Sequence, residues 1–250
     1  HGSRHHALRH DEAINHIHWA TTRRPQPPEL MALAIDHRAQ LAALADRLGV
    51  DRSRINRFKT LAVAAATRVA GGRPGFGMLL DETYGREALF AAAKQPFWIG
   101  RPVELPGSCP LRFEVSQDIG GRLAEWPVTH TVKCLAFFHP DDAGELRREQ
   151  TEKLRALYDA ARRNGLELLV EIIAGKTGAL ADDTTARVLA ELYAAGIKPD
   201  WWKLEPQPSA AAWRAIETAI AGNDPWCRGV VLLSLQAPES ELERAFAACA

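Results

Sequence analysis

Seven short apolar segments alternate with longer amphipathic segments along this chain, and no other feature limits the fold as strongly. The apolar segments are residues 31–36, 76–81, 97–103, 131–138, 166–173, 200–205 and 228–235. Helical patterns lie between and after them, at 39–48, 53–70, 85–94, 142–165, 182–196, 209–222 and 238–250. Strands that alternate with helices in this way predict a parallel β-sheet built from βα units.

Seven βα units leave room for one more in a closed barrel. We therefore predict an α/β fold of the (β/α)8 TIM-barrel type over residues 29–250, truncated after the seventh unit, because the chain stops inside a helical pattern. A doubly wound open sheet is the alternative. No GxGxxG follows a strand, and "GGRPGFG" at 71–77 precedes one, so a dinucleotide site is not expected.

The first 28 residues are polar and end in a proline cluster, which predicts a linker or a leading helix. Six histidines lie in this region, and His5 with His6 or His16 with His18 would be the obvious metal ligands. No cysteine and no HxxxH pair on an apolar helix accompanies them. A metal site is therefore the weaker interpretation, and neither a metal nor another cofactor is expected.

The charge balance argues against polyanionic partners. The 250 residues hold 31 basic and 31 acidic side chains, so a nucleic acid or an anionic membrane surface is not an expected partner. Four scattered cysteines without a CxxC pair favour a reducing compartment, and no apolar run has the length of a membrane span. We expect a cytoplasmic protein whose partners are small molecules or proteins, with a homo-oligomer as a possibility.

Several apolar segments carry an ionisable residue inside or at the carboxyl end, where barrels assemble their active sites. These residues are Asp36, Asp81, Lys133, Glu171 and Lys203. Two ordinary interpretations remain open: the aspartates would cap the following helices, and the other three would form a structural salt-bridge network. Trp201 and Trp202 are expected to pack rather than to stack on a substrate.

Lys203, in "PDWWKLEP", suggests a specific chemistry, because an ammonium group taken out of water needs a partner or a function. Burial and the nearby cation of Lys133 would lower its pKa, and a neutral amine attacks ketones to form a Schiff base. Glu171 would then move the protons. Glu205 shares the strand face of Lys203 and is either its partner or a carboxylate that would raise its pKa.

Longer motifs resemble a known family. They are "LAIDHRAQL", "LLDETYG", "WIGRPVELPGS", "VKCLAFFHPDD", "LLVEII", "GIKPDWWKLEP" and "CRGVVLLSLQAPE", and they cover nearly the whole chain from about residue 20 onward. The chain resembles the DUF2090 domain, the C-terminal half of fused bacterial 5-dehydro-2-deoxygluconokinases of inositol catabolism. More distantly, it is similar to the class I tagatose-bisphosphate aldolases.

The resemblance implies roles for individual residues. Lys203 would be the Schiff-base nucleophile, with Lys133, Glu171 and Asp36 as the other catalytic residues, and the substrate-binding residues would be Arg38, Asp81 and Ser234. The implied reaction cleaves 2-deoxy-5-keto-gluconate 6-phosphate to dihydroxyacetone phosphate and malonate semialdehyde. The Gly-Arg phosphate turn of the relatives would follow residue 250, and a kinase domain would be the partner in a fused parent.

The sequence leaves two further functions open. One is a non-catalytic module that binds a sugar phosphate, or that packs on the kinase to regulate or stabilise it. The other is a metal-dependent aldolase, which the lack of clustered histidines in the barrel segments disfavours.

Overall fold

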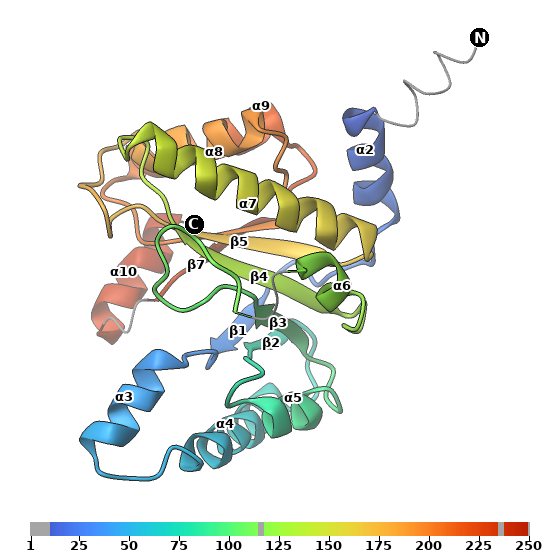
Figure 1. Ribbon diagram of the computed structural model, residues 1–250, viewed down its shortest axis with the longest axis vertical. Coiled ribbons are helices and arrows are strands. Elements are labelled where there is room, and N and C mark those ends of the chain that lie inside the picture. Colours follow the sequence, from blue (N-terminus) through green and yellow to red (C-terminus); the bar gives the residue numbers. More distant parts are fainter. Residues whose placement is uncertain (1–10, 115–117, 235–237, 250) are drawn as a thin grey trace.

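The computed structural model describes residues 11–114, 118–234 and 238–249. Its strands form one seven-stranded sheet in which every neighbouring pair is parallel and the spatial order follows the chain (Figure 1). They are β1 (Met31–Ala34), β2 (Phe76–Leu79), β3 (Trp98–Pro102), β4 (His130–Phe137), β5 (Glu167–Ile173), β6 (Trp201–Leu204) and β7 (Gly229–Leu232). All seven predicted strands are thus confirmed, although Leu235 of the last one lies outside the described residues.

The helices follow the predicted pattern as well. They are α2 (Glu12–Thr22), α3 (Ala39–Arg47), α4 (Arg54–Ala70), α5 (Arg86–Ala92), α6 (Ile119–Leu123), α7 (Gly144–Arg163), α8 (Thr184–Ala194), α9 (Ala210–Asn223) and α10 (Glu239–Cys249). Only α6 was not predicted. It has five residues, two of them glycines, so it is too short to show a helical period.

The strand order decides between the two predicted architectures. A doubly wound sheet reverses its strand order at a switch point, whereas here each strand pairs with its predecessor from β1 to β7. The seven parallel strands form a curled half-barrel, with helices alternating along the chain as in a TIM barrel. Within the described sheet, β1 and β7 are the two edges.

The side chains of each strand divide between two environments, as a period of two requires. On β4, Val132, Cys134 and Ala136 face the helices and belong to the largest apolar core, together with residues of α7 and α8. Lys133 lies between them in sequence and faces the concave side. A smaller apolar cluster lies on the concave side as well, and its buried members are Leu79, Trp98, Leu169 and Trp201. Trp201 therefore packs in this cluster, and Trp202 packs in the largest apolar core, as predicted for both.

Helix α2 lies against the amino-terminal ends of the strands. Its contacts there are mostly polar: Trp19 Nε1 donates to Asp200 at 2.7 Å, and His16 Nε2 lies 2.8 Å from Asp224 Oδ1. His16 is the one α2 residue that is buried, and its contact is a carboxylate of this chain. The N-terminal segment thus contains a leading helix, while His5 and His6 lie outside the described residues.

Candidate active site

Two lysines and a glutamate meet on the concave face of the sheet. Parallel pairing places Glu171 of β5 beside Lys203 of β6, and the period of two gives both side chains the same face. Lys203 Nζ lies 3.2 Å from Glu171 Oε1, and Lys133 Nζ lies 2.9 Å from Glu171 Oε2. All three side chains are buried. Glu171 therefore bridges the two lysines.

Two further carboxylates complete the cluster around Lys133. Asp36 lies two residues after the end of β1, and its carboxylate is 3.4 Å from Lys133 Nζ. The carboxylate of Glu104 is 3.0 Å from the same Lys133 Nζ. Glu104 was not predicted as a site residue, although "PVELPGS" places it after β3 much as Asp36 follows β1. The signal was its position at the carboxyl end of a buried strand.

The charges of the cluster hold one another in the ionised state. Burial opposes the charge on Lys133, but the carboxylates of Glu104, Glu171 and Asp36 outweigh it and raise the pKa of Lys133 well above its ordinary value. Burial likewise opposes ionisation of Asp36, whereas the ammonium groups of Lys133 and Lys203 hold its pKa at about 2. Lys133 thus stays a cation and Asp36 an anion at neutral pH.

Arg38 is two residues after Asp36, and its side chain binds the loop that follows β3. Its guanidinium donates to the backbone carbonyl of Glu104 at 2.9 Å, to Glu104 Oε1 at 2.9 Å and to Glu114. Burial opposes its charge, yet Glu104 and Glu114 raise the pKa of Arg38. The guanidinium therefore ties Glu104 to the turn after β1.

The cluster lines a cavity of about 590 Å³. Its walls come from all seven strands of the described sheet and from the loop that carries Glu104. Six of the seven predicted site residues line it: Asp36, Arg38, Lys133, Glu171, Lys203 and Ser234. Ser234 lies at the exposed rim.

Asp81 is the predicted residue that does not line this cavity. Its carboxylate pairs with the buried Lys59 and accepts a hydrogen bond from Tyr84 N at 2.8 Å. Glu205 also has a backbone role, because its Oε1 accepts from Gly175 N at 2.8 Å. Burial raises the pKa of Glu205 despite that bond. Both carboxylates therefore accept hydrogen bonds from backbone N–H groups of loops, Asp81 from the loop after β2 and Glu205 from the loop after β5.

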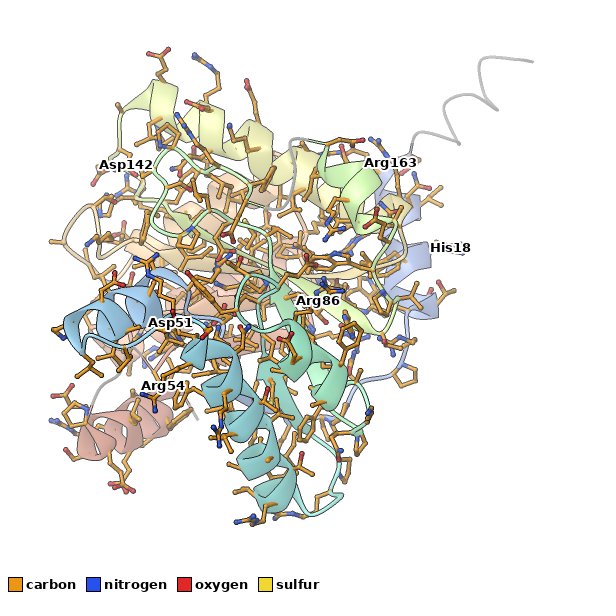
Figure 2. The ribbon with its side chains drawn as sticks, turned by 60° about the horizontal axis from the view of Figure 1, so that its bottom comes forward. His18, Asp51, Arg54, Arg86, Asp142 and Arg163 are labelled. Atoms are coloured by element: carbon orange, nitrogen blue, oxygen red, sulfur yellow. The ribbon has the colours of Figure 1, made fainter. Side chains whose placement is uncertain are left out.

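A larger cavity of about 980 Å³ lies at the other end of the molecule, between α2, α7 and the end of α8. His18 and Arg163, both labelled in Figure 2, line it. Its arginines Arg155 and Arg162 are paired with Glu12 and Asp200, and the clustered lysines and carboxylates of the smaller cavity have no counterpart in its lining. We therefore take the smaller cavity as the candidate site.

Two other features are absent from the described residues. No group of three or more histidine, cysteine, aspartate or glutamate side chains is arranged to hold a metal ion. No helix within the described ranges has the length and apolar character needed to cross a membrane.

Comparison with solved structures places the fold among aldolase-like barrels. A fructose-bisphosphate aldolase from Plasmodium falciparum, solved in a ternary complex with TRAP and an inhibitor, superposes with a TM-score of 0.62 at 15% identity, over 96% of this chain and 80% of that one. The Corynebacterium glutamicum protein Cgl0159 superposes with a TM-score of 0.53 at 18% identity, over 98% and 93% of the two chains. At these identities the likeness shows the fold.

The chain belongs to the family described as "Uncharacterized protein conserved in bacteria (DUF2090)", whose model matches residues 1–250. This is the family that the sequence motifs resemble. No curated protein matches the chain.

Proposed function

We propose that this chain is a Schiff-base aldolase domain with Lys203 as its nucleophile. The observation that carries the proposal is the position of Glu171, within 3.2 Å of Lys203 Nζ and 2.9 Å of Lys133 Nζ. An amine that forms an imine needs a neighbouring group that takes its proton and returns it to the departing oxygen. Glu171 is suited to this because it contacts the amine directly. The aldolase-like fold supports the assignment.

The chemistry needs only side chains of this cavity. Lys203 gives a proton to Glu171 and its amine attacks the keto carbon; Glu171 then protonates the carbinolamine hydroxyl, which leaves as water and gives an iminium ion. Glu171, ionised again, takes the proton from the hydroxyl of the β carbon; the bond between the α and β carbons breaks, which releases an aldehyde and sends the electron pair into an enamine. Protonation of the α carbon and addition of water then release the second product and free Lys203.

The remaining residues have supporting roles in this scheme. Lys133, which keeps its charge, attracts developing negative charge on substrate oxygens. Asp36 orients substrate hydroxyl groups, and Ser234 lies where it would help to hold a phosphate. Arg38 acts through Glu104 rather than on the substrate, because its guanidinium is already engaged.

The substrate that we propose is 2-deoxy-5-keto-gluconate 6-phosphate, cleaved to dihydroxyacetone phosphate and malonate semialdehyde. The motif resemblance supports this choice, as it does a parent chain with a kinase domain and an eighth βα unit that closes the barrel and adds phosphate ligands. The scattered cysteines support a cytoplasmic location. The open edges of β1 and β7 are compatible with such a unit.

Borohydride trapping tests the nucleophile. The protein is incubated with dihydroxyacetone phosphate, reduced, digested and analysed by mass spectrometry. We expect a covalent adduct on Lys203 in the wild type and none in Lys203→Met. Lys198→Met, which removes a lysine from the opposite end of the sheet, should still give the adduct.

Two outcomes would replace the proposal. If calorimetry shows that dihydroxyacetone phosphate or the full substrate binds but no adduct forms, the domain is a sugar-phosphate-binding module. If cleavage of the full substrate is abolished by chelation and restored by a divalent metal, the reaction is that of a metal-dependent aldolase.

A further inference from the structure

Lys59 is a fully buried charge in an otherwise apolar helix face. Helix α4 buries Ile55, Lys59, Val63 and Ala70, so the lysine occupies a position where the helical period calls for an apolar residue. Figure 2 shows α4, whose first residue Arg54 is labelled, on the same side of the molecule as α5, which begins at Arg86. A lysine held in such a place needs strong partners.

The ammonium group of Lys59 contacts two partners. Lys59 Nζ forms an ion pair with Asp81, which follows β2, and donates to the backbone carbonyl of His37 at 3.0 Å. Burial lowers the pKa of Lys59 even though Asp81 opposes the shift. Asp81 is itself fixed, because its other oxygen accepts from Tyr84 N at 2.8 Å. The lysine thus connects the ends of β1 and β2.

The carbonyl that Lys59 holds lies at the centre of the turn that begins the site. Asp36 precedes it and lies 3.4 Å from Lys133, while Arg38 follows it and donates to Glu104 at 2.9 Å. Asp36, His37 and Arg38 all line the cavity, whereas Lys59 and Asp81 do not. A movement of this carbonyl would therefore displace two members of the cluster together.

We infer that Lys59 and Asp81 are a positioning pair that fixes the turn of residues 36–38, so that Asp36 faces the lysines and Arg38 faces Glu104. A buried ion pair is a poor source of stability compared with apolar residues of similar volume, so a positional role explains its presence better than stabilisation does. The inference rests on the proposed function for its catalytic consequence, but not for its geometry.

The test replaces the pair without leaving a charge unpaired. In the double variant Lys59→Met/Asp81→Asn no buried charge is left unpaired, and the side-chain amide oxygen can still accept from Tyr84 N, so we expect the melting temperature to stay close to that of the wild type. Because a displacement of about 1 Å at a catalytic group costs about a hundredfold in rate, the rate of borohydride trapping at saturating dihydroxyacetone phosphate should fall about a hundredfold. Asp81→Glu, which keeps the ion pair, should restore much of that rate relative to the double variant.

A matched control separates position from stability. Val63→Ala lies one turn further along the same buried face of α4 and removes apolar contact without touching the turn. It should lower the melting temperature while the trapping rate at saturation stays at the wild-type value. Loss of the trapping rate in Val63→Ala, as in the double variant, would contradict the positioning role.

A readout that needs no enzyme activity tests the geometry separately. In protein labelled with 13C at lysine, the side-chain signals of Lys133 and Lys203 should shift in the double variant, because the carboxylate of Asp36 moves away. If the lysine signals shift in the double variant but the wild-type protein forms no adduct, the positioning role of Lys59 and Asp81 stands and the aldolase proposal is wrong. Unchanged lysine signals together with an unchanged trapping rate would overturn the positioning pair.

Discussion

Lys133 illustrates how single charges are tolerated in this core. It lies within 3.4 Å of three carboxylates, those of Asp36, Glu104 and Glu171. The same three carboxylates have Lys203 and Arg38 as further cationic neighbours, so the buried charges balance within one contiguous group. The balance explains why a cluster of this size is stable in a low-dielectric interior.

His130 gives a pH-dependent prediction at the residue scale. Burial, with the charges of Arg101 and Arg24, lowers the pKa of His130 to about 4. The unfolded chain binds a proton below about pH 6.5, whereas the folded protein does not until about pH 4, so folding stability falls as the pH drops through this window. We expect a loss of about 1–3 kcal/mol from this residue.

Urea unfolding at several pH values measures the effect. His130→Gln should flatten the dependence of the unfolding free energy between pH 6.5 and 4. His18→Gln, a change at an exposed histidine of α2, should leave the slope as it is in the wild type. A slope that persists in His130→Gln would assign the pH dependence to other groups.

At the scale of single elements, the carboxylate of Asp200 connects the amino-terminal end of β6 to its neighbours. Asp200 precedes the strand and accepts hydrogen bonds from Leu168 N at 2.8 Å and Arg162 at 2.8 Å, as well as from Trp19 and Arg23 of the α2 region. It therefore links β5, α7 and the leading helix to the strand that carries Lys203. The carboxylate is fully buried.

Removal of this carboxylate should be costly. Asp200→Ala leaves Arg162 and Arg23 without their buried partner, and we expect a destabilisation of about 3–5 kcal/mol. Urea unfolding measures it, and hydrogen exchange of peptides from α2 reports whether α2 detaches first. Glu152→Ala, at an exposed glutamate of α7, should change the free energy of unfolding by less than about 0.5 kcal/mol. Equal midpoints for the two variants would refute the anchoring role of Asp200.

The sequence predicted those elements whose local pattern determines them. The alternation of apolar and amphipathic segments predicted the seven strands, and the ionisable residues of those segments predicted four of the charged residues that line the cavity, namely Asp36, Lys133, Glu171 and Lys203. Lys59 was not predicted because its helix has an apolar period that one charge does not disturb. The position of Glu104 after β3 was a local signal, but its contacts with Lys133 and Arg38 join elements far apart in sequence, and no local pattern contains them. The roles of Asp81 and Glu205 depend on contacts of the same kind.

At the scale of the whole molecule, the curled sheet has a protected middle and two open edges. Strands β4 and β5 pair over seven positions, Thr131–Phe137 with Glu167–Ile173, and they lie under the largest apolar core. By contrast, β1 and β7 have four residues each and a single partner strand in the described sheet. Met31 and Leu33 of β1 are exposed.

Hydrogen exchange of backbone amides tests this gradient. Amides of β4 and β5 should open only through global unfolding, whereas those of β1 and β7 should exchange through local opening with a smaller free energy. Measured by mass spectrometry of peptides, protection should therefore fall from the middle of the sheet to both edges. Equal protection of β1 and β7 with β4 would mean that the edges are paired in solution, and a concentration-dependent protection would identify a second copy of the chain as the partner.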